Sequence, residues 1–188
     1  MIVRLEKGLQ EAVELVWTKT RNSSDPSLVF NPSGRIPFLL LEDGVGFEDT
    51  DVIIDYFDSL SAPPRYIPPS GEAYWPFRRA QAIARSMLDG ISLWLREYIY
   101  RPAEMHSETI IDHERRRALR LADIFEKEVE SKSLSGPINM AQITLACIFH
   151  GSMIDNLPEF AWREGRPHLC NWVERIGQNL SVKETAPA

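Results

Sequence analysis

NPSGRIPFLLL at residues 31–41, followed by FEDTDVIIDY at residues 47–56, decides the fold of this chain of 188 residues. Its first part reads as a turn, a proline at the entrance of a strand, and a buried apolar strand at residues 38–41. Glu42-Asp43-Gly44 is typical of the turn of a β-hairpin, because glycine takes a positive φ without a steric penalty. We therefore expect residues 45–47 to form the return strand.

An amphipathic helix is predicted directly after this hairpin, over residues 51–60. Val52, Tyr56 and Leu60 recur at intervals of four residues, which places them on one face of the helix. We expect that face to pack against the two strands. The whole stretch then forms a small α/β unit whose turns leave polar groups for a peptide-like ligand with carboxylates.

Gly34-Arg35-Ile36-Pro37 leaves two interpretations open. A trans proline in a loop is the commoner one, because cis X–Pro bonds are a small minority in folded proteins. With a cis bond, Ile36 turns its N–H and C=O toward a ligand that lies alongside. Proline suits the strand entrance in either case, since it donates no hydrogen bond to the ladder.

Glu48-Asp49-Thr50 stands where the predicted helix begins, and it also leaves two interpretations open. Asp49 and Thr50 are residue types that cap a helix N-terminus through their side-chain oxygens. A helix start also attracts anions through its free N–H groups and the positive end of its dipole. Thr50 would then bind a ligand carboxylate, and Asp49 a ligand ammonium group.

Outside this stretch the chain divides into three parts. Residues 13–17 alternate and are rich in β-formers, so we expect a strand there. Residues 1–62 form the predicted α/β domain, and the proline-rich residues 63–76 read as a linker. Residues 77–188 carry helical periodicity nearly throughout. The fold class is therefore α/β followed by all-α.

Composition narrows the function classes. A net charge of −6 gives no basic excess for nucleic acid, so we expect no nucleic-acid partner. No apolar run reaches the roughly 18 residues of a membrane helix, and no signal peptide is evident. The four histidines lack zinc-ligand spacing, so we expect no metal. A cytoplasmic location is the simplest expectation.

The two cysteines, Cys147 and Cys170, are far apart and form no Cys-x-x-Cys motif. Cys147 lies in an apolar stretch at residues 139–157 that predicts a central buried helix. We expect a buried structural thiol there, because free cysteine is among the most buried residue types. Four residues of one predicted helix leave two interpretations open, either as lining of a ligand cleft or as bundle core or dimer contact: Met87, Trp94, Tyr98 and Tyr100.

The motif order resembles that of the glutathione S-transferases: Asn-Pro-x-Gly-basic-apolar-Pro, apolar strand, Asp-Gly hairpin, and an acidic-Ser/Thr helix start. This resemblance implies a thioredoxin-like N-terminal domain and an all-helical C-terminal domain. It also implies glutathione as substrate. By the same resemblance, Ile36 and Pro37 grip the cysteinyl backbone of glutathione, Asp49 and Thr50 hold its γ-glutamyl end, and Arg35 faces its glycyl carboxylate.

The helical half resembles the same family. Asn139 and Gln142 stand where the family has a Ser/Thr-x-x-Asp capping box at the start of its central helix. Such a box satisfies two backbone N–H groups that the helix itself leaves free. Residues 162–172 resemble the final core helix of the family.

The start of the chain departs from the family pattern. Residues 5–9 resemble the end of the family's first helix. We therefore expect the first strand of the sheet, and the loop with the catalytic Ser, Tyr or Cys, to be missing from the sequence as printed. No residue in 1–8 matches the signature that stabilises the glutathione thiolate, which is the nucleophile. We accordingly predict no catalytic residue in this chain.

The resemblance implies a detoxification enzyme that joins glutathione to a small hydrophobic electrophile and works as a homodimer. Conjugation is expected once the missing N-terminal segment is restored. Two alternatives stay open. One is a glutathione-dependent reductase or isomerase on the same scaffold, and the other is a non-catalytic module that binds glutathione.

Overall fold

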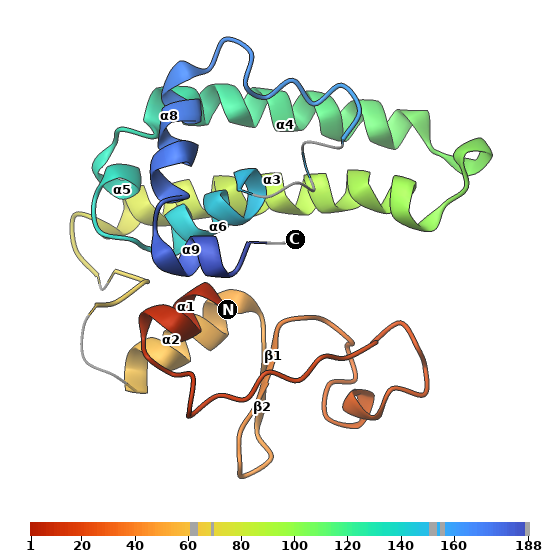
Figure 1. Ribbon diagram of the computed structural model, residues 1–188, viewed down its shortest axis with the longest axis vertical. Helices are drawn as coiled ribbons and strands as arrows, with labels where there is room; N and C mark the ends of the chain where they lie inside the picture. Colours follow the sequence, from red (N-terminus) through yellow and green to blue (C-terminus); the bar gives the residue numbers. More distant parts are fainter. Residues whose placement is uncertain (61–63, 69, 151–153, 155–156, 187–188) are drawn as a thin grey trace. The chain divides into compact units, whose positions relative to one another are not determined.

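A computed structural model describes residues 1–60, 64–68, 70–150, 154 and 157–186. The chain divides into two compact units, Met1–Ile67 and Pro68–Ala188. The first unit is small and mixed, and the second is helical (Figure 1). The predicted order of α/β followed by all-α is therefore confirmed.

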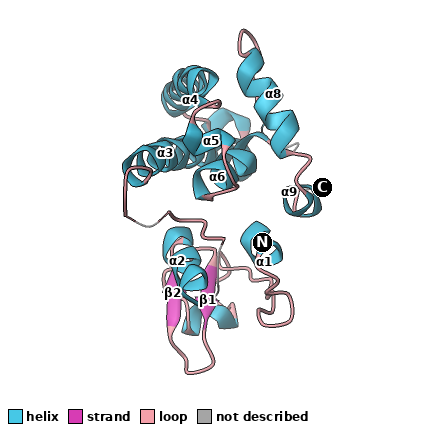
Figure 2. Cartoon of the chain, turned by 90° about the vertical axis from the view of Figure 1, so that its left-hand side faces the viewer, coloured by secondary structure: helices cyan, strands magenta, loops and turns pink. Residues whose placement is uncertain are grey.

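The first unit contains a two-stranded antiparallel sheet, with β1 (Phe38–Leu40) paired to β2 (Gly46–Glu48). Figure 2 shows the two strands as a hairpin beside α2 (Thr50–Leu60). Gly44 in the connecting turn has φ +86°, a conformation that favours glycine. The predicted hairpin and the helix after it are thus confirmed, but β1 is not the buried strand that was predicted, since Phe38 and Leu39 are half-buried and Leu40 is 42% exposed. The unit also includes α1 (Ile2–Glu6) and the 3₁₀ helix η1 (Pro26–Val29).

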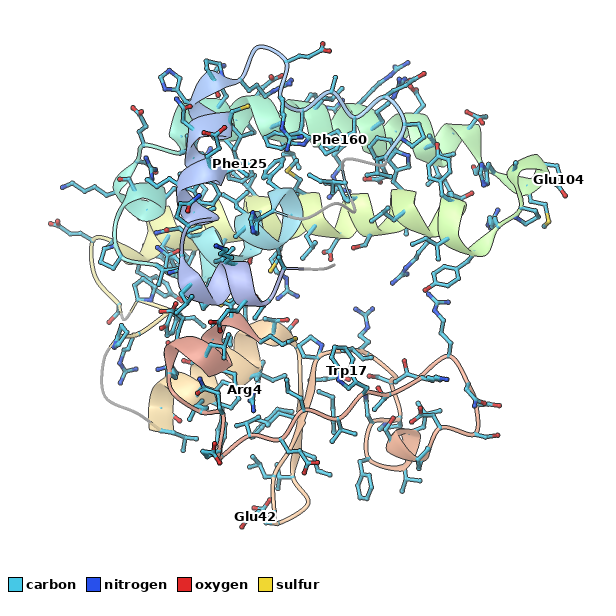
Figure 3. All side chains as sticks on the ribbon, in the orientation of Figure 1. Arg4, Trp17, Glu42, Glu104, Phe125 and Phe160 are labelled. Atoms are coloured by element: carbon cyan, nitrogen blue, oxygen red, sulfur yellow. The ribbon has the colours of Figure 1, made fainter. Side chains whose placement is uncertain are left out.

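The strand predicted at residues 13–17 is absent from the structure. Within the described residues the sheet has only β1 and β2, and residues 14–19 have no regular secondary structure. Trp17 lies on this segment, and its side chain is 86% exposed. Figure 3 labels this residue. Strand propensity alone does not form a strand, because a ladder also needs a hydrogen-bonding neighbour.

The buried face of α2 differs from the predicted one. Ile53, Ile54 and Phe57 are buried, whereas Val52 and Leu60 are exposed. Tyr56 does face the sheet, with its ring centroid 5.0 Å from that of Phe47 on β2. Apolar residues occupy two adjoining stripes of this helix, so spacing alone did not decide which stripe packs.

The second unit is built mainly from two long helices. They are α3 (Tyr74–Tyr100) and α4 (Glu108–Glu128). The 3₁₀ helix η2 (Ala103–Met105) lies between them in the chain, and Glu104 marks this turn in Figure 3. Four shorter helices complete the described part: α5 (Lys132–Ser135), α6 (Met140–Phe149), α8 (Pro167–Ile176) and α9 (Leu180–Glu184).

Polar residues before several helices explain where they begin. Ser107 accepts a hydrogen bond from the Ile110 N–H at the start of α4. Asn139 accepts from the Ala141 and Gln142 N–H groups at the start of α6, which confirms the predicted cap. The Gln142 amide does not complete the box, because it donates to the carbonyls of Gly136 and Pro137 instead.

Two helix boundaries differ from the sequence prediction. The helix predicted from residue 77 begins at Tyr74, and Pro76 falls in its first turn, where a backbone N–H has no helical partner. α6 ends at Phe149 rather than continuing to residue 157, and residues 151–153 and 155–156 lie outside the described residues. The domain limits 1–62, 63–76 and 77–188 stay a prediction.

Large aromatic side chains form the core of the second unit. Trp94, Phe125 and Trp172 are each at most 2% exposed. The Trp172 indole N–H donates to the Leu134 carbonyl at 2.7 Å, and the Trp94 ring lies edge-on to Phe160. Phe125 and Phe160 are labelled in Figure 3. Trp94 and Met87 are therefore core residues of the bundle, whereas Tyr98 is half-buried and Tyr100 is exposed.

Cys147 is exposed, so the expected buried thiol is a wrong prediction. It is the one exposed residue of α6, whose other residues are all buried. Although the residue meets solvent, the surrounding protein atoms reduce the hydration of its thiol and raise its pKa.

In the described part of the chain, none of the helices is both long and apolar enough to span a membrane.

Candidate functional site

The turn at residues 31–35 is held by the side chains of Asn31 and Ser33. Asn31 is 3% exposed, and its amide donates to the Arg35 carbonyl at 2.8 Å. The Asn31 carbonyl accepts from the Gly34 N–H, and Gly34 takes φ +63°. The Arg35 N–H donates to Ser33 Oγ at 3.2 Å. This small network sets the direction in which the chain enters Ile36 and Pro37.

The Ile36–Pro37 peptide bond is cis, the second of the two interpretations of this segment. Ile36 is 66% exposed. Within the described residues, neither its N–H nor its C=O makes a hydrogen bond. Both groups remain available to a ligand, which is the property that the motif predicts.

Strand pairing brings the two halves of the motif together. Phe38 pairs with Glu48 at the end of the ladder. Pro37 and Asp49 are the next residues outward on either side of this pair. Opposite residues of an antiparallel pair lie about 4.5–5.5 Å apart between Cα atoms. Both segments therefore flank the same end of the hairpin.

Asp49 has an unusual backbone conformation, with φ +76°. A positive φ is uncommon outside glycine, although aspartate tolerates it better than most residues. Its Oδ1 accepts from the Asp51 N–H at 2.8 Å, so the carboxylate caps α2 as one interpretation predicts. Residues held in such conformations cluster at functional sites.

Thr50 and Arg35 keep their polar groups available. Thr50 begins α2, and its hydroxyl makes no hydrogen bond within the described residues. Arg35 is exposed, and in the same part of the chain its guanidinium has neither an ion pair nor a hydrogen bond. One end of the hairpin thus offers a cation, a hydroxyl and a helix start. That combination suits a ligand with more than one carboxylate.

Two residues in this region were missed by the sequence analysis. Ser33 Oγ donates a short hydrogen bond to Glu48 Oε2, which joins the turn to the end of β2. A signal was present, because a serine inside a turn commonly bonds to nearby polar groups. The sequence did not show that Glu48 is the partner of Ser33. The register that brings these two residues together follows from the pairing of the two strands.

The described residues also bear on two other kinds of site, a metal site and a surface pocket. They contain no group of three or more His, Cys, Asp or Glu side chains arranged to hold a metal ion. An open pocket of about 610 Å³ is lined only by α4 side chains: Glu108, Thr109, Asp112, His113, Arg116 and Arg120. Arg116 pairs with Asp112 there, and Arg115 together with Arg116 lowers the pKa of the Asp112 carboxyl.

Comparison with known proteins gives the same family for sequence and structure. The model of the glutathione S-transferase N-terminal domain matches residues 1–60, which include the whole hairpin motif. The uncharacterized GST-like protein YibF of Escherichia coli K12 is 28% identical over 187 residues. That alignment covers 99% of this chain and 91% of YibF.

Two crystal structures of a glutathione transferase family member from Pseudomonas fluorescens Pf-5 are also similar. The one with bound glutathione has a TM-score of 0.89 at 28% identity, and the one with bound S-(propanoic acid)-glutathione has 0.85 at 29%. Each comparison covers 100% of this chain and 91% of the other. The likeness therefore extends through the thioredoxin-like unit and the helical unit alike, and the chain is similar along its whole length to glutathione S-transferase family members.

Proposed function

We propose that this protein binds glutathione at the hairpin end and, when joined to a thiol-activating Ser, Tyr or Cys loop, conjugates it to a small hydrophobic electrophile. The backbone of Ile36, beside Pro37, holds the cysteinyl residue of glutathione. Arg35 binds the glycyl carboxylate. Asp49 takes the γ-glutamyl ammonium group, and Thr50 takes the γ-glutamyl carboxylate through its hydroxyl.

The observation that carries this proposal is the pairing of Phe38 with Glu48. It sets an unpaired backbone amide at Ile36 next to an acidic-hydroxyl pair at a helix start. Glutathione presents complementary groups, namely a peptide backbone, an ammonium group and two carboxylates. Charge-assisted hydrogen bonds of this kind are worth roughly 1.5–3 kcal/mol each.

In the proposed reaction, the glutathione thiolate attacks an electrophilic carbon of the second substrate. A sulfur–carbon bond forms, and either a leaving group departs or an activated double bond takes up a proton. Positioning both substrates removes much of the entropic barrier. We propose that the active protein is a cytoplasmic homodimer.

Calorimetric titration with glutathione tests the binding site. Replacing Arg35 by Ala or Thr50 by Val should each weaken binding about tenfold, since either change removes one charge-assisted contact. Arg65→Ala is the matched control, because Arg65 is an exposed arginine of the same unit whose side chain makes no hydrogen bond or ion pair in the described residues. An equal effect of Arg65→Ala would show that net charge, and not the site, determines affinity.

Conjugation is tested with a chromogenic aromatic halide, with identification of the thioether by mass spectrometry. The sequence predicts that thiol activation needs a Ser, Tyr or Cys loop upstream of the motif. A chain extended by such a strand and loop should therefore be much faster than the chain as printed. Equal rates would contradict that prediction. Disulfide turnover without any thioether, or binding without turnover in either chain, would reject the proposed conjugation.

A further inference from the structure

We propose that Glu48 is a positioning residue of the glutathione site and acts on it through Ser33. This inference rests on the proposed function, since it concerns how the same site is kept in shape. Glu48 itself has no assigned contact with the ligand. Its carboxylate joins the segment that holds the cysteinyl and glycyl residues to the segment that holds the γ-glutamyl group.

The contacts run in one continuous chain. Glu48 Oε2 accepts the short hydrogen bond from Ser33 Oγ, and Ser33 Oγ accepts from the Arg35 N–H at 3.2 Å. The Arg35 carbonyl accepts from the Asn31 amide at 2.8 Å. Both backbone groups of Arg35 are therefore held, and its carbonyl belongs to the same peptide group as the Ile36 N–H.

The direction of the hydroxyl proton makes the carboxylate important. Ser33 Oγ has a single proton and lies near two acceptors, Glu48 Oε2 and Asn31 Oδ1, the latter at 3.1 Å. A carboxylate is the stronger acceptor, so the proton is directed to Glu48. The lone pairs of the hydroxyl then remain toward the Arg35 N–H. Without the carboxylate, the hydroxyl can rotate toward Asn31, and its lone pairs turn with it.

The position of Glu48 in the chain couples both halves of the site. Glu48 is the last residue of β2 and directly precedes Asp49, which has positive φ. The ladder between β1 and β2 has only three pairs. So short a hairpin is marginally stable by itself, and its ends are where pairing is lost first. A side-chain link at that end therefore limits the separation of Arg35 from Asp49 and Thr50.

Glu42 provides a matched control within the same hairpin. It lies at the exposed tip, where Figure 3 labels it, and its side chain makes no contact in the described residues. Removing Glu42 changes the net charge as much as removing Glu48 does. A comparison of the two variants therefore separates the effect of losing the Ser33–Glu48 hydrogen bond from the effect of losing one negative charge.

The test is a double-mutant cycle on the full chain, with calorimetric titration of glutathione. We expect Glu48→Ala and Ser33→Ala each to weaken binding roughly tenfold, the range of one charge-assisted hydrogen bond. The double variant should be no weaker than either single one, because both changes break the same link. Glu48→Gln should weaken binding less than Glu48→Ala does, because its amide oxygen still accepts from Ser33 but is no longer a stronger acceptor than Asn31 Oδ1. Glu42→Ala should bind normally.

A second ligand distinguishes positioning from a general loss of structure. γ-Glutamylcysteine lacks the glycyl residue that Arg35 is proposed to hold, so the unmodified chain should prefer glutathione. Glu48→Ala should reduce this preference several-fold, because the displaced residue is Arg35. A general loss of structure would weaken both ligands equally, and that result would overturn the positioning role.

Two further results would also overturn the inference. Full additivity of the two single changes would mean that Ser33 and Glu48 act separately. Equal binding by Glu48→Ala and Glu42→Ala would mean that the link has no effect. If the unmodified chain fails to bind glutathione, the proposed function is rejected and the positioning role with it, whereas binding that is insensitive to Glu48 rejects the positioning role alone.

Discussion

At the residue scale, a buried polar cluster holds the first unit together. The Lys7 ammonium nitrogen lies 2.9 Å from Asp58 Oδ1, and both side chains are almost fully buried. Asp58 Oδ2 accepts from the N–H groups of Tyr66 and Ile67, at 2.8 and 3.0 Å. The Tyr66 hydroxyl donates to Glu6 at 3.4 Å. One carboxylate on α2 thus connects the end of α1 to the segment that follows α2 in the chain.

Tyr66 gives this cluster a predictable response to alkaline pH. Burial raises the pKa of its phenol above the usual value of 10, and the nearby carboxylates of Glu6 and Asp58 add to the shift. The folded state therefore keeps the proton that the unfolded state loses. Stability from this source is complete below pH 10 and declines as the pH rises beyond it. Urea unfolding at pH 8 and pH 11 should show a smaller decline for Tyr66→Phe than for the unmodified chain. Identical declines would contradict this.

At the scale of elements, α3 and α4 pack closely where Gly90 faces Glu114. Glu114 is 6% exposed and pairs with Arg117 at 3.0 Å, and Arg117 also donates to the Ser86 carbonyl on α3 at 2.8 Å. A Cβ on Gly90 would clash with Glu114 Oε2. Glycine in the middle of a helix costs about 1 kcal/mol relative to alanine. Here the close approach of the carboxylate explains its presence.

Gly90→Ala should therefore destabilise the protein, although alanine is the better helix former. We expect a loss of about 1–3 kcal/mol in the free energy of unfolding, the typical cost of overpacking. The sign should reverse in a Glu114→Ala background, where the carboxylate is gone and only the helix propensity remains. Chemical denaturation of the four variants measures both effects. A destabilising Gly90→Ala in both backgrounds would show that another contact is responsible.

At the scale of the whole molecule, the two units differ in how completely they bury apolar side chains. Most of the large, fully buried residues belong to the helical unit, including its three buried tryptophans. The first unit has one two-stranded sheet in its described part, and Val16, Trp17 and Phe30 are more than half exposed. Such a sheet with little core is marginally stable in isolation.

We predict that residues 68–188 fold alone and residues 1–67 do not. The helical fragment should keep its far-ultraviolet circular dichroism and unfold cooperatively, because its aromatic core is self-contained. The smaller fragment should show no cooperative transition. Circular dichroism melts of both fragments beside the full chain test this. A cooperative transition in the smaller fragment would contradict the prediction.

Local signals in the sequence were sufficient for much of the architecture and for the candidate site. The hairpin follows from an apolar run and Gly44, and the start of α6 follows from Asn139. Such features depend on a few neighbouring residues, so they can be read directly. The strand predicted at residues 13–17 was wrong for the opposite reason. A strand exists only when another strand is available to pair with it, and local residues do not show that.

By itself, the sequence determined the order of elements, the family motif, and the residue types that we propose hold the ligand. Only the tertiary structure decided which stripe of α2 is buried, that Cys147 is exposed, that Ser33 meets Glu48, and that Gly90 accommodates Glu114. The physical reason is that these outcomes depend on contacts between residues far apart in the chain. Propensity and periodicity act over one or two turns, whereas register and packing are set by the partner that each segment meets.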